Sequence, residues 1–312
     1  MIASNQQFCQ YRENNNDKEN LNLNAETKAG WILFATTALA GLGWIFSKET
    51  IQGLPPFGFI GLRFLIASVC LLPLCFKRFR QLTVSHMAQA VGGGAILSLA
   101  LLSWVYAISI SETLGEGAFI VSLSMIIVPI IAWILYQDRP KRAFWISMPI
   151  AVAGLAMLSL TNGWNSSMGQ VWFLANACLL ALHFNVNSQL ARKVPVLLLT
   201  CIQLFVTGVI ALIMSLIFET FPSSVDASIW GWFAMSALLA TSLRYVMQTL
   251  GQKGCNPANA ALIMLFEPIW TVVLSIVWYG EQLSGNKLIG CGLILTALVF
   301  YRTDGRFLKR RI

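Results

Sequence analysis

Residues 256–283, NPANAALIMLFEPIWTVVLSIVWYGEQL, form a stretch that is long and apolar enough to cross the hydrocarbon core of a membrane as one helix. Glu267 lies near its middle, and Pro268 follows directly. An ionised glutamate near the bilayer centre costs about 2.5–3.5 kcal/mol, so a chain that keeps one there has a use or a partner for it. On a helix, the polar and small side chains of the stretch lie within about 40° of one line. They are Asn256, Ala260, Ile263, Glu267, Thr271, Leu274, Trp278 and Glu281. This stripe is expected to face a helical bundle or a cavity.

The composition of the whole chain is that of a polytopic membrane protein. Apolar residues make up 57% of the 312 and charged residues only 11%, whereas soluble domains carry about 25% charged residues. The net charge of +8 does not predict a nucleic-acid partner, because the basic residues lie in short clusters between apolar runs. The seven cysteines show no metal or redox spacing, so no metal or other cofactor is expected.

Ten apolar segments recur along the chain, and the connections between them leave no room for a soluble domain. Backbone that lies in lipid must satisfy its hydrogen bonds internally, and these segments are too long to be barrel strands. The sequence therefore predicts an all-α integral membrane protein with ten transmembrane helices. The segments are 30–48, 56–76, 87–109, 115–136, 143–161, 169–190, 196–218, 228–250, 257–279 and 284–301.

The distribution of lysine and arginine predicts the orientation of the chain. Basic residues follow the second, fourth, sixth and eighth segments and close the chain, while the alternate connections carry few. Positive charge marks the cytoplasmic side, so both termini are expected in the cytoplasm of a multi-pass inner (plasma) membrane protein. Residues 1–28 are expected to form a polar, disordered tail and residues 303–312 a basic tail.

An internal repeat is visible in the rhythm of the apolar segments. A shift of 143 residues matches Asp138 with Glu281, and a shift of 140 matches Arg63 with Gln203. Because each half holds five segments, the second half must enter the membrane upside down. Inverted repeats of this kind place a site near mid-membrane and allow alternating access. The predicted repeats are residues 29–163 and 164–302.

Several short motifs resemble those of the EamA type of the drug/metabolite transporter superfamily. They are Gly41 to Lys48, Gly61-Leu62-Arg63-Phe64, Ala260 to Glu281 with its Glu-Pro and Tyr-Gly-Glu, and Gly290. The resemblance covers residues 30–302 and implies the ten-helix fold and transport. It does not imply one substrate, since the family moves amino acids, other metabolites and drugs. The chain departs from the family at Met125, where a proline is usual, and at Ala40, where an aromatic residue is frequent.

Polar side chains inside the sixth and eighth segments are candidates for a substrate cavity. His183 shares a helical stripe with Asn176 and Asn187. That stripe is either a cavity wall or a set of hydrogen bonds that joins helices. Arg244, one turn from Gln248, can bind a substrate carboxylate with two N–H groups, or it can form a structural ion pair.

The remaining candidates are aromatic or acidic. Trp44 and Trp104 lie well inside their segments, where a flat ring can cover an apolar or cationic ligand. Glu267 is expected both to bind substrate and to act as a protonatable gate or coupling site. Glu116 and Arg63 complete the predicted coupling and gating residues, although Arg63 can also extend to the membrane surface.

These observations predict a secondary active transporter and not an enzyme. No nucleotide-binding motif is present, and the two histidines lie in neither an HExxH nor a GxSxG context. The expected substrate is a small molecule, an amino acid or a derivative, which leaves the cell by proton coupling or exchange. The alternative is an importer or exchanger of a quaternary ammonium or sulfonium compound. An integral-membrane enzyme and a channel are the disfavoured classes. Within the lipid bilayer, the chain is expected to be a monomer or a weak dimer.

Overall fold

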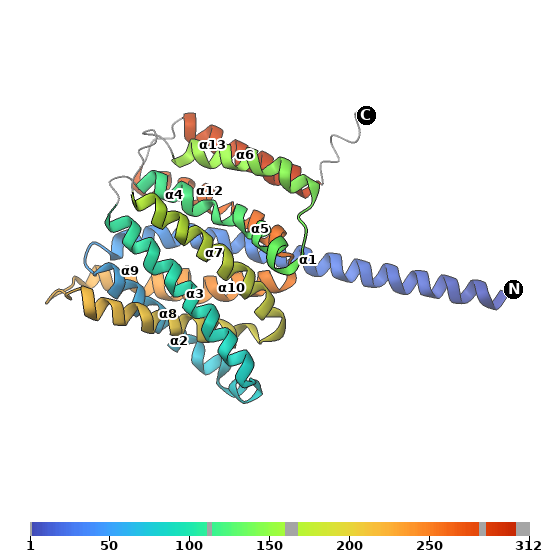
Figure 1. The fold of residues 1–312 in the computed structure, drawn as a ribbon, viewed down its shortest axis with the longest axis horizontal. Coiled ribbons are helices and arrows are strands. Elements are labelled where there is room, and N and C mark those ends of the chain that lie inside the picture. Colours follow the sequence, from blue (N-terminus) through green and yellow to red (C-terminus); the bar gives the residue numbers. More distant parts are fainter. Residues whose placement is uncertain (1, 111–113, 160–167, 281–284, 304–312) are drawn as a thin grey trace.

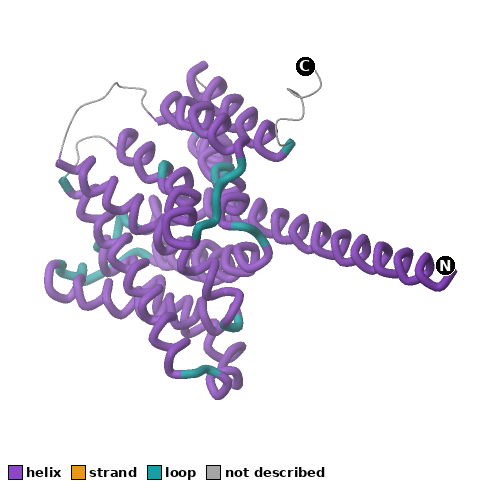
Figure 2. The backbone as a smooth tube through the Cα atoms, turned by 45° about the vertical axis from the view of Figure 1, so that its right-hand side comes forward, coloured by secondary structure: helices purple, strands orange, loops and turns teal. Residues whose placement is uncertain are grey.

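The computed structural model describes residues 2–110, 114–159, 168–280 and 285–303, and these residues form helices without strands (Figures 1 and 2). Side chains are described from residue 25 on, except at 81, 108–109, 114–116, 159 and 302. Seven helical segments are long and apolar enough to cross a membrane, and two apolar helices are shorter. The predicted all-α membrane-spanning class is confirmed.

Seven elements of the fold are single α-helices. They are α1 (Ile2–Thr50), α2 (Pro56–Cys75), α3 (Val84–Ser109), α6 (Arg142–Ser159), α7 (Met168–Lys193), α8 (Val196–Phe218) and α13 (Gly285–Arg302). A short 3-10 helix, η1 (Phe76–Gln81), follows α2.

Three further helical stretches are interrupted. They consist of α4 (Leu114–Ser122) with α5 (Ser124–Tyr136), of α9 (Ala227–Ala237) with the π-helix η2 (Leu238–Leu243) and α10 (Arg244–Gly254), and of α11 (Pro257–Met264) with α12 (Glu267–Tyr279). In their described residues, all ten predicted segments are helical. The stretch Ala227–Gly254 is not among the seven long spans, and α6 and α13 are the two shorter apolar helices.

The N-terminal helix differs from the sequence-based expectation. The backbone of residues 2–28 is helical and continuous with the first span, where a disordered tail was predicted. No proline or glycine occurs before Gly30, so nothing in this segment interrupts a helix. In Figure 1 this part of α1 projects away from the bundle.

Glycines bring two pairs of helices close together. In the pair α2–α8, a Cβ atom on Gly61 would lie 2.7 Å from the backbone nitrogen of Leu212. In the pair α6–α13, a Cβ atom on Gly154 would lie 2.8 Å from the carbonyl oxygen of Gly290. Figure 1 shows α6 and α13 side by side at one edge of the bundle. Small residues at these crossings allow the backbones to approach, as is typical of membrane helices.

The rest of the bundle surrounds α1, α7 and α10. Helix α3 packs along α7 and also contacts α8, while α1 packs along α10 and α12. Helices α5 and α11 contact each other, and α5 also lies against α7. This arrangement brings the interruptions in α4–α5, α9–α10 and α11–α12 toward the middle of the bundle.

Proline chemistry explains one of these interruptions and not another. Pro268 has no N–H to donate back to the preceding turn, and α11 ends at Met264 just before it. The break between α4 and α5 lies at Leu123, yet Met125 stands where the family has its proline. Both α5 and α12 end on a left-handed residue, Gln137 at φ 57° and Gly280 at φ 65°.

A carboxylate at the end of α8 holds the first turn of α2. The backbone N–H groups of Phe57 and Gly58 each donate to Glu219 at 2.8 Å, and the Ser215 hydroxyl donates to the same carboxylate at 2.8 Å. The first N–H groups of a helix have no partner within the helix, and the positive end of its dipole favours an anion. This contact fixes α2 against α8 at the same end of the bundle.

Candidate functional site

A cavity with two lobes lies among α1, α3, α7, α10 and α12. The His183 lobe has a volume of about 370 Å³ and also contacts Gln248, Ser122 and Ser124. The Arg63 lobe has a volume of about 350 Å³ and also contacts Ser47. The two lobes share a wall, which consists of Trp44, Trp104, Val121, Leu180, Arg244, Tyr245 and Glu267.

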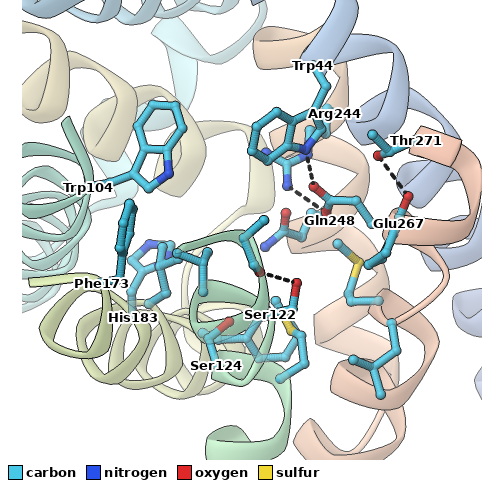
Figure 3. A pocket seen from close by; sticks show the side chains of 18 of the residues that line it. Trp44, Trp104, Ser122, Ser124, Phe173, His183, Arg244, Gln248, Glu267 and Thr271 are labelled. Atoms are coloured by element: carbon cyan, nitrogen blue, oxygen red, sulfur yellow. Dashed lines mark hydrogen bonds and ion pairs between the residues drawn. The ribbon is translucent and has the colours of Figure 1, made fainter. Parts of the chain in front are cut away.

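Glu267 is the first residue of α12 and holds the centre of the shared wall. The indole Nε1 of Trp44 donates to its Oε1 at 3.2 Å, and Nη2 of Arg244 lies 3.6 Å from its Oε2 (Figure 3). Both charged side chains remain partly accessible, at 19% for Arg244 and 24% for Glu267. The structure thus brings Trp44, Arg244 and Glu267 together, and the pair stays open to a ligand or to water.

Aromatic rings line the same wall. Trp44 and Trp104 meet edge to face, with ring centroids 6.1 Å apart, and the Arg244 guanidinium lies 5.1 Å from the centroid of the Tyr245 ring. Gln248 lies one turn beyond Arg244 in α10 and is buried, and its Oε1 has no hydrogen-bond partner. This amide oxygen is therefore an acceptor that a ligand donor in the His183 lobe can use.

The predicted histidine lies in the cavity wall with a partner from another helix. His183 is 3% exposed, and its Nε2 lies 3.4 Å from Oε1 of Gln203 in α8. Gln203 is buried as well, and its Nε2 has no partner. The sequence analysis did not select Gln203 as a site residue; its match with Arg63 under the 140-residue shift was the available signal.

The two predicted asparagines occupy different environments. Asn176 lines the Arg63 lobe, but its Nδ2 donates to the carbonyl oxygen of Ala100 at 2.7 Å. Asn187 is not among the residues that line either lobe. Its Nδ2 instead donates to Thr249 and Gln252 in α10. For Asn187, the alternative interpretation as a contact between helices describes the structure.

Arg63 lines its lobe and does not extend to the membrane surface. Its Nη1 donates to Ser47 in α1 at 2.9 Å and its Nη2 to the carbonyl oxygen of Ala240 at 3.2 Å. Its Nε donates to Thr241. The side chain of Glu116 lies outside the described residues. Ser122 and Ser124 are site residues that the sequence analysis missed, although Ser124 corresponds to Glu267 under the 143-residue shift.

Comparison with solved structures finds the same fold. One crystal structure superposes with a TM-score of 0.80 at 17% sequence identity and covers 90% of this chain and 99% of its own. At this identity the likeness shows the fold alone.

The sequence is also similar to curated transporters. It is 22% identical over 286 residues to a protein of Bacillus subtilis named "Uncharacterized transporter YoaV", a match that covers 86% of this chain and 97% of that one. It is 23% identical over 288 residues to the "Uncharacterized inner membrane transporter YedA" of Escherichia coli, covering 88% and 90% respectively. The profile of the EamA-like transporter family matches twice, at residues 28–160 and 167–303. These two matches span most of the chain, which therefore belongs to the EamA-like transporter family.

Proposed function

We propose that the chain exports a small zwitterionic metabolite, an amino acid or a derivative, across the inner (plasma) membrane by alternating access. The observation that carries this proposal is the open Arg244–Glu267 pair in an aromatic cavity. A zwitterion presents one anionic and one cationic group, and the pair offers a partner to each. The surrounding rings and aliphatic side chains accept varied apolar substituents.

The balance of charge favours a carboxylate-bearing substrate over a purely cationic one. Among the described residues that line the two lobes, the charged side chains are Arg63, Arg244 and Glu267. With His183 neutral, these residues carry one positive charge in excess. A cation alone would add to that excess, whereas a zwitterion leaves it unchanged and brings a carboxylate to it.

Two inverted five-helix repeats supply the mechanism of this proposal. Helices α5 (Ser124–Tyr136) and α12 (Glu267–Tyr279) begin and end 143 residues apart, and so do their left-handed caps Gln137 and Gly280. The packing supports the same relation: α3 lies on α7 as α1 lies on α10, while α2 meets α8 and α6 meets α13. Two halves with equivalent contacts can exchange conformations, which opens the cavity to each side in turn.

The energy for export comes from a proton gradient or from exchange, with Glu267 as the proposed coupling site. We propose that the protein works as a monomer or weak dimer in the bilayer, with both termini in the cytoplasm. An enzyme is disfavoured, because the polar groups of the cavity form an ion pair and hydrogen-bond donors without a nucleophile–base pair among the described lining residues.

Transport into proteoliposomes tests the substrate class. Purified protein is expected to catalyse counterflow of at least one labelled amino acid or derivative, and a screen for thermal stabilisation by the same compounds selects which to label. Protein-free liposomes and the same protein after heat denaturation are the controls. Failure of every amino acid and derivative to stabilise or to move would overturn the proposed substrate.

A cationic metabolite is the second candidate. The edge-to-face pair of Trp44 and Trp104 beside Glu267 is an arrangement that can also bind a quaternary ammonium or sulfonium group. Choline and S-methylmethionine in the same counterflow assay separate the two. Movement of choline with inert zwitterions would favour this second function.

The orientation is a separate prediction. Alkaline phosphatase, which is active only outside the cytoplasm, is expected to be inactive when fused after Ile312. It is expected to be active when inserted between Ser223 and Ser224, in the connection from α8 to α9, because that connection carries no lysine or arginine. The opposite pattern of activities would reverse the proposed topology.

A further inference from the structure

Arg63 is a buried cationic group in the cavity wall that the central ion pair does not use. It lies in α2 and lines the Arg63 lobe together with Trp44, Arg244 and Glu267. We propose that Arg63 is the carboxylate-binding subsite of the substrate, while the ammonium group lies at Glu267 and Trp44. This inference rests on the proposed function and specifies how the substrate is oriented.

The hydrogen bonds of Arg63 do not neutralise its charge. The Ser47 hydroxyl accepts from Arg63 and donates its own proton to the carbonyl oxygen of Gly43 at 2.6 Å. The Thr241 hydroxyl likewise accepts from Arg63 and donates to the carbonyl oxygen of Ser236 at 3.0 Å. Both hydroxyls therefore act as neutral acceptors, and the full positive charge of the guanidinium remains in the cavity wall.

The guanidinium also keeps unused donors. Of its five N–H groups, three are engaged by Thr241, Ser47 and the Ala240 carbonyl oxygen. One N–H remains on each terminal nitrogen, which suffices for a two-pronged contact with a carboxylate. The rings of Phe59 and Phe64 lie 5.4 and 6.0 Å from the guanidinium carbon and help to hold its orientation.

Among the described residues, no carboxylate lies within ion-pair distance of Arg63. Arg244 differs in this respect, because Glu267 already compensates it at 3.6 Å. An unpaired charge in an apolar wall is costly, and an arriving carboxylate removes that cost. Substrate carboxylate is thus expected to prefer Arg63 to Arg244. Glu267 and Trp44 remain available to the ammonium group in the same lobe.

The test compares ligands that differ only in the carboxylate. The twenty standard L-amino acids and their primary amides are titrated into the purified full-length protein, and the apparent dissociation constant is obtained from thermal stabilisation. The titration is made at pH 6, where the amine of acid and amide alike is protonated. The wild type is expected to bind at least one acid about tenfold more tightly than its amide.

Substitutions at Arg63 should remove this preference. Arg63→Gln is expected to bring acid and amide to within about twofold of each other, and Arg63→Lys, which keeps the charge and loses the fork, to reduce the preference at least about threefold. Ser47→Ala is the matched control: it deletes one partner of Arg63 and leaves the guanidinium, so the tenfold preference should persist.

The outcomes separate this inference from the proposed function. A wild type that binds no amino acid or derivative contradicts the proposed function. A wild type that prefers the acid, with an Arg63→Gln variant that prefers it equally, contradicts the assignment of Arg63 alone. If Arg63→Gln does not fold, Arg63→Lys decides, since an unchanged preference in that variant also overturns the assignment.

Discussion

Glu267→Gln is expected to reduce gradient-driven transport by at least about a hundredfold while leaving substrate exchange measurable. The amide cannot release a proton, and it leaves the Arg244 guanidinium without its counter-charge in the shared wall. Removing one partner of a buried ion pair costs about 3–5 kcal/mol. With partial exposure at this site, a loss near 3 kcal/mol still corresponds to about a hundredfold in rate.

Proteoliposomes with an imposed pH gradient measure the coupled reaction, and counterflow without a gradient measures exchange. Glu49→Gln is the matched control, because Glu49 lies in α1 outside the residues that line the cavity and its contact with the Tyr279 hydroxyl is kept by an amide oxygen. An unchanged pH dependence of transport in Glu267→Gln would show that this carboxyl is not the coupling site.

Gly61→Ala is expected to lower the stability of the protein more than any other single methyl addition discussed here. The new Cβ would lie 2.7 Å from the Leu212 backbone nitrogen and 2.9 Å from its Cα, so one of two packed helices must move. Overpacking of this kind costs about 1–3 kcal/mol, and contact with backbone atoms favours the upper end. The apparent melting temperature in detergent should fall by roughly 5–10 °C.

Gly92→Ala in α3 provides the comparison, since a Cβ there meets no atom within 4 Å. Alanine has the better helix propensity, so this variant should be as stable as the wild type or slightly more stable. Equal destabilisation by both substitutions would mean that the close approach of α2 and α8 does not limit stability.

Membrane physics made much of the fold predictable. Lipid forces the backbone into helices, so the apolar segments give each helix to within a few residues. The break before Pro268 follows from a missing N–H. The π-helix Leu238–Leu243 could not be predicted, because it depends on tertiary contacts: Ala240 and Thr241 both accept hydrogen bonds from Arg63. The break at Leu123 likewise has no proline to mark it.

The site was predictable where lipid penalises a residue strongly. Charged or large polar groups in mid-span, such as Arg244 and Glu267, must face protein or a cavity. Amides and hydroxyls are less informative, because membrane helices also use them to bind each other. Helical periodicity places Asn187 on a face but does not identify its neighbour, and the neighbour is α10. Gln203 was missed for the same reason.

The wall shared by the two lobes sets a stoichiometry for the proposed transport cycle. Trp44, Arg244 and Glu267 belong to both lobes, so a molecule bound against them in one lobe occupies part of the other. Two substrate molecules then compete for loading and cannot be carried side by side. Exchange through this cavity should be strictly one for one, with the outgoing molecule leaving before its replacement binds.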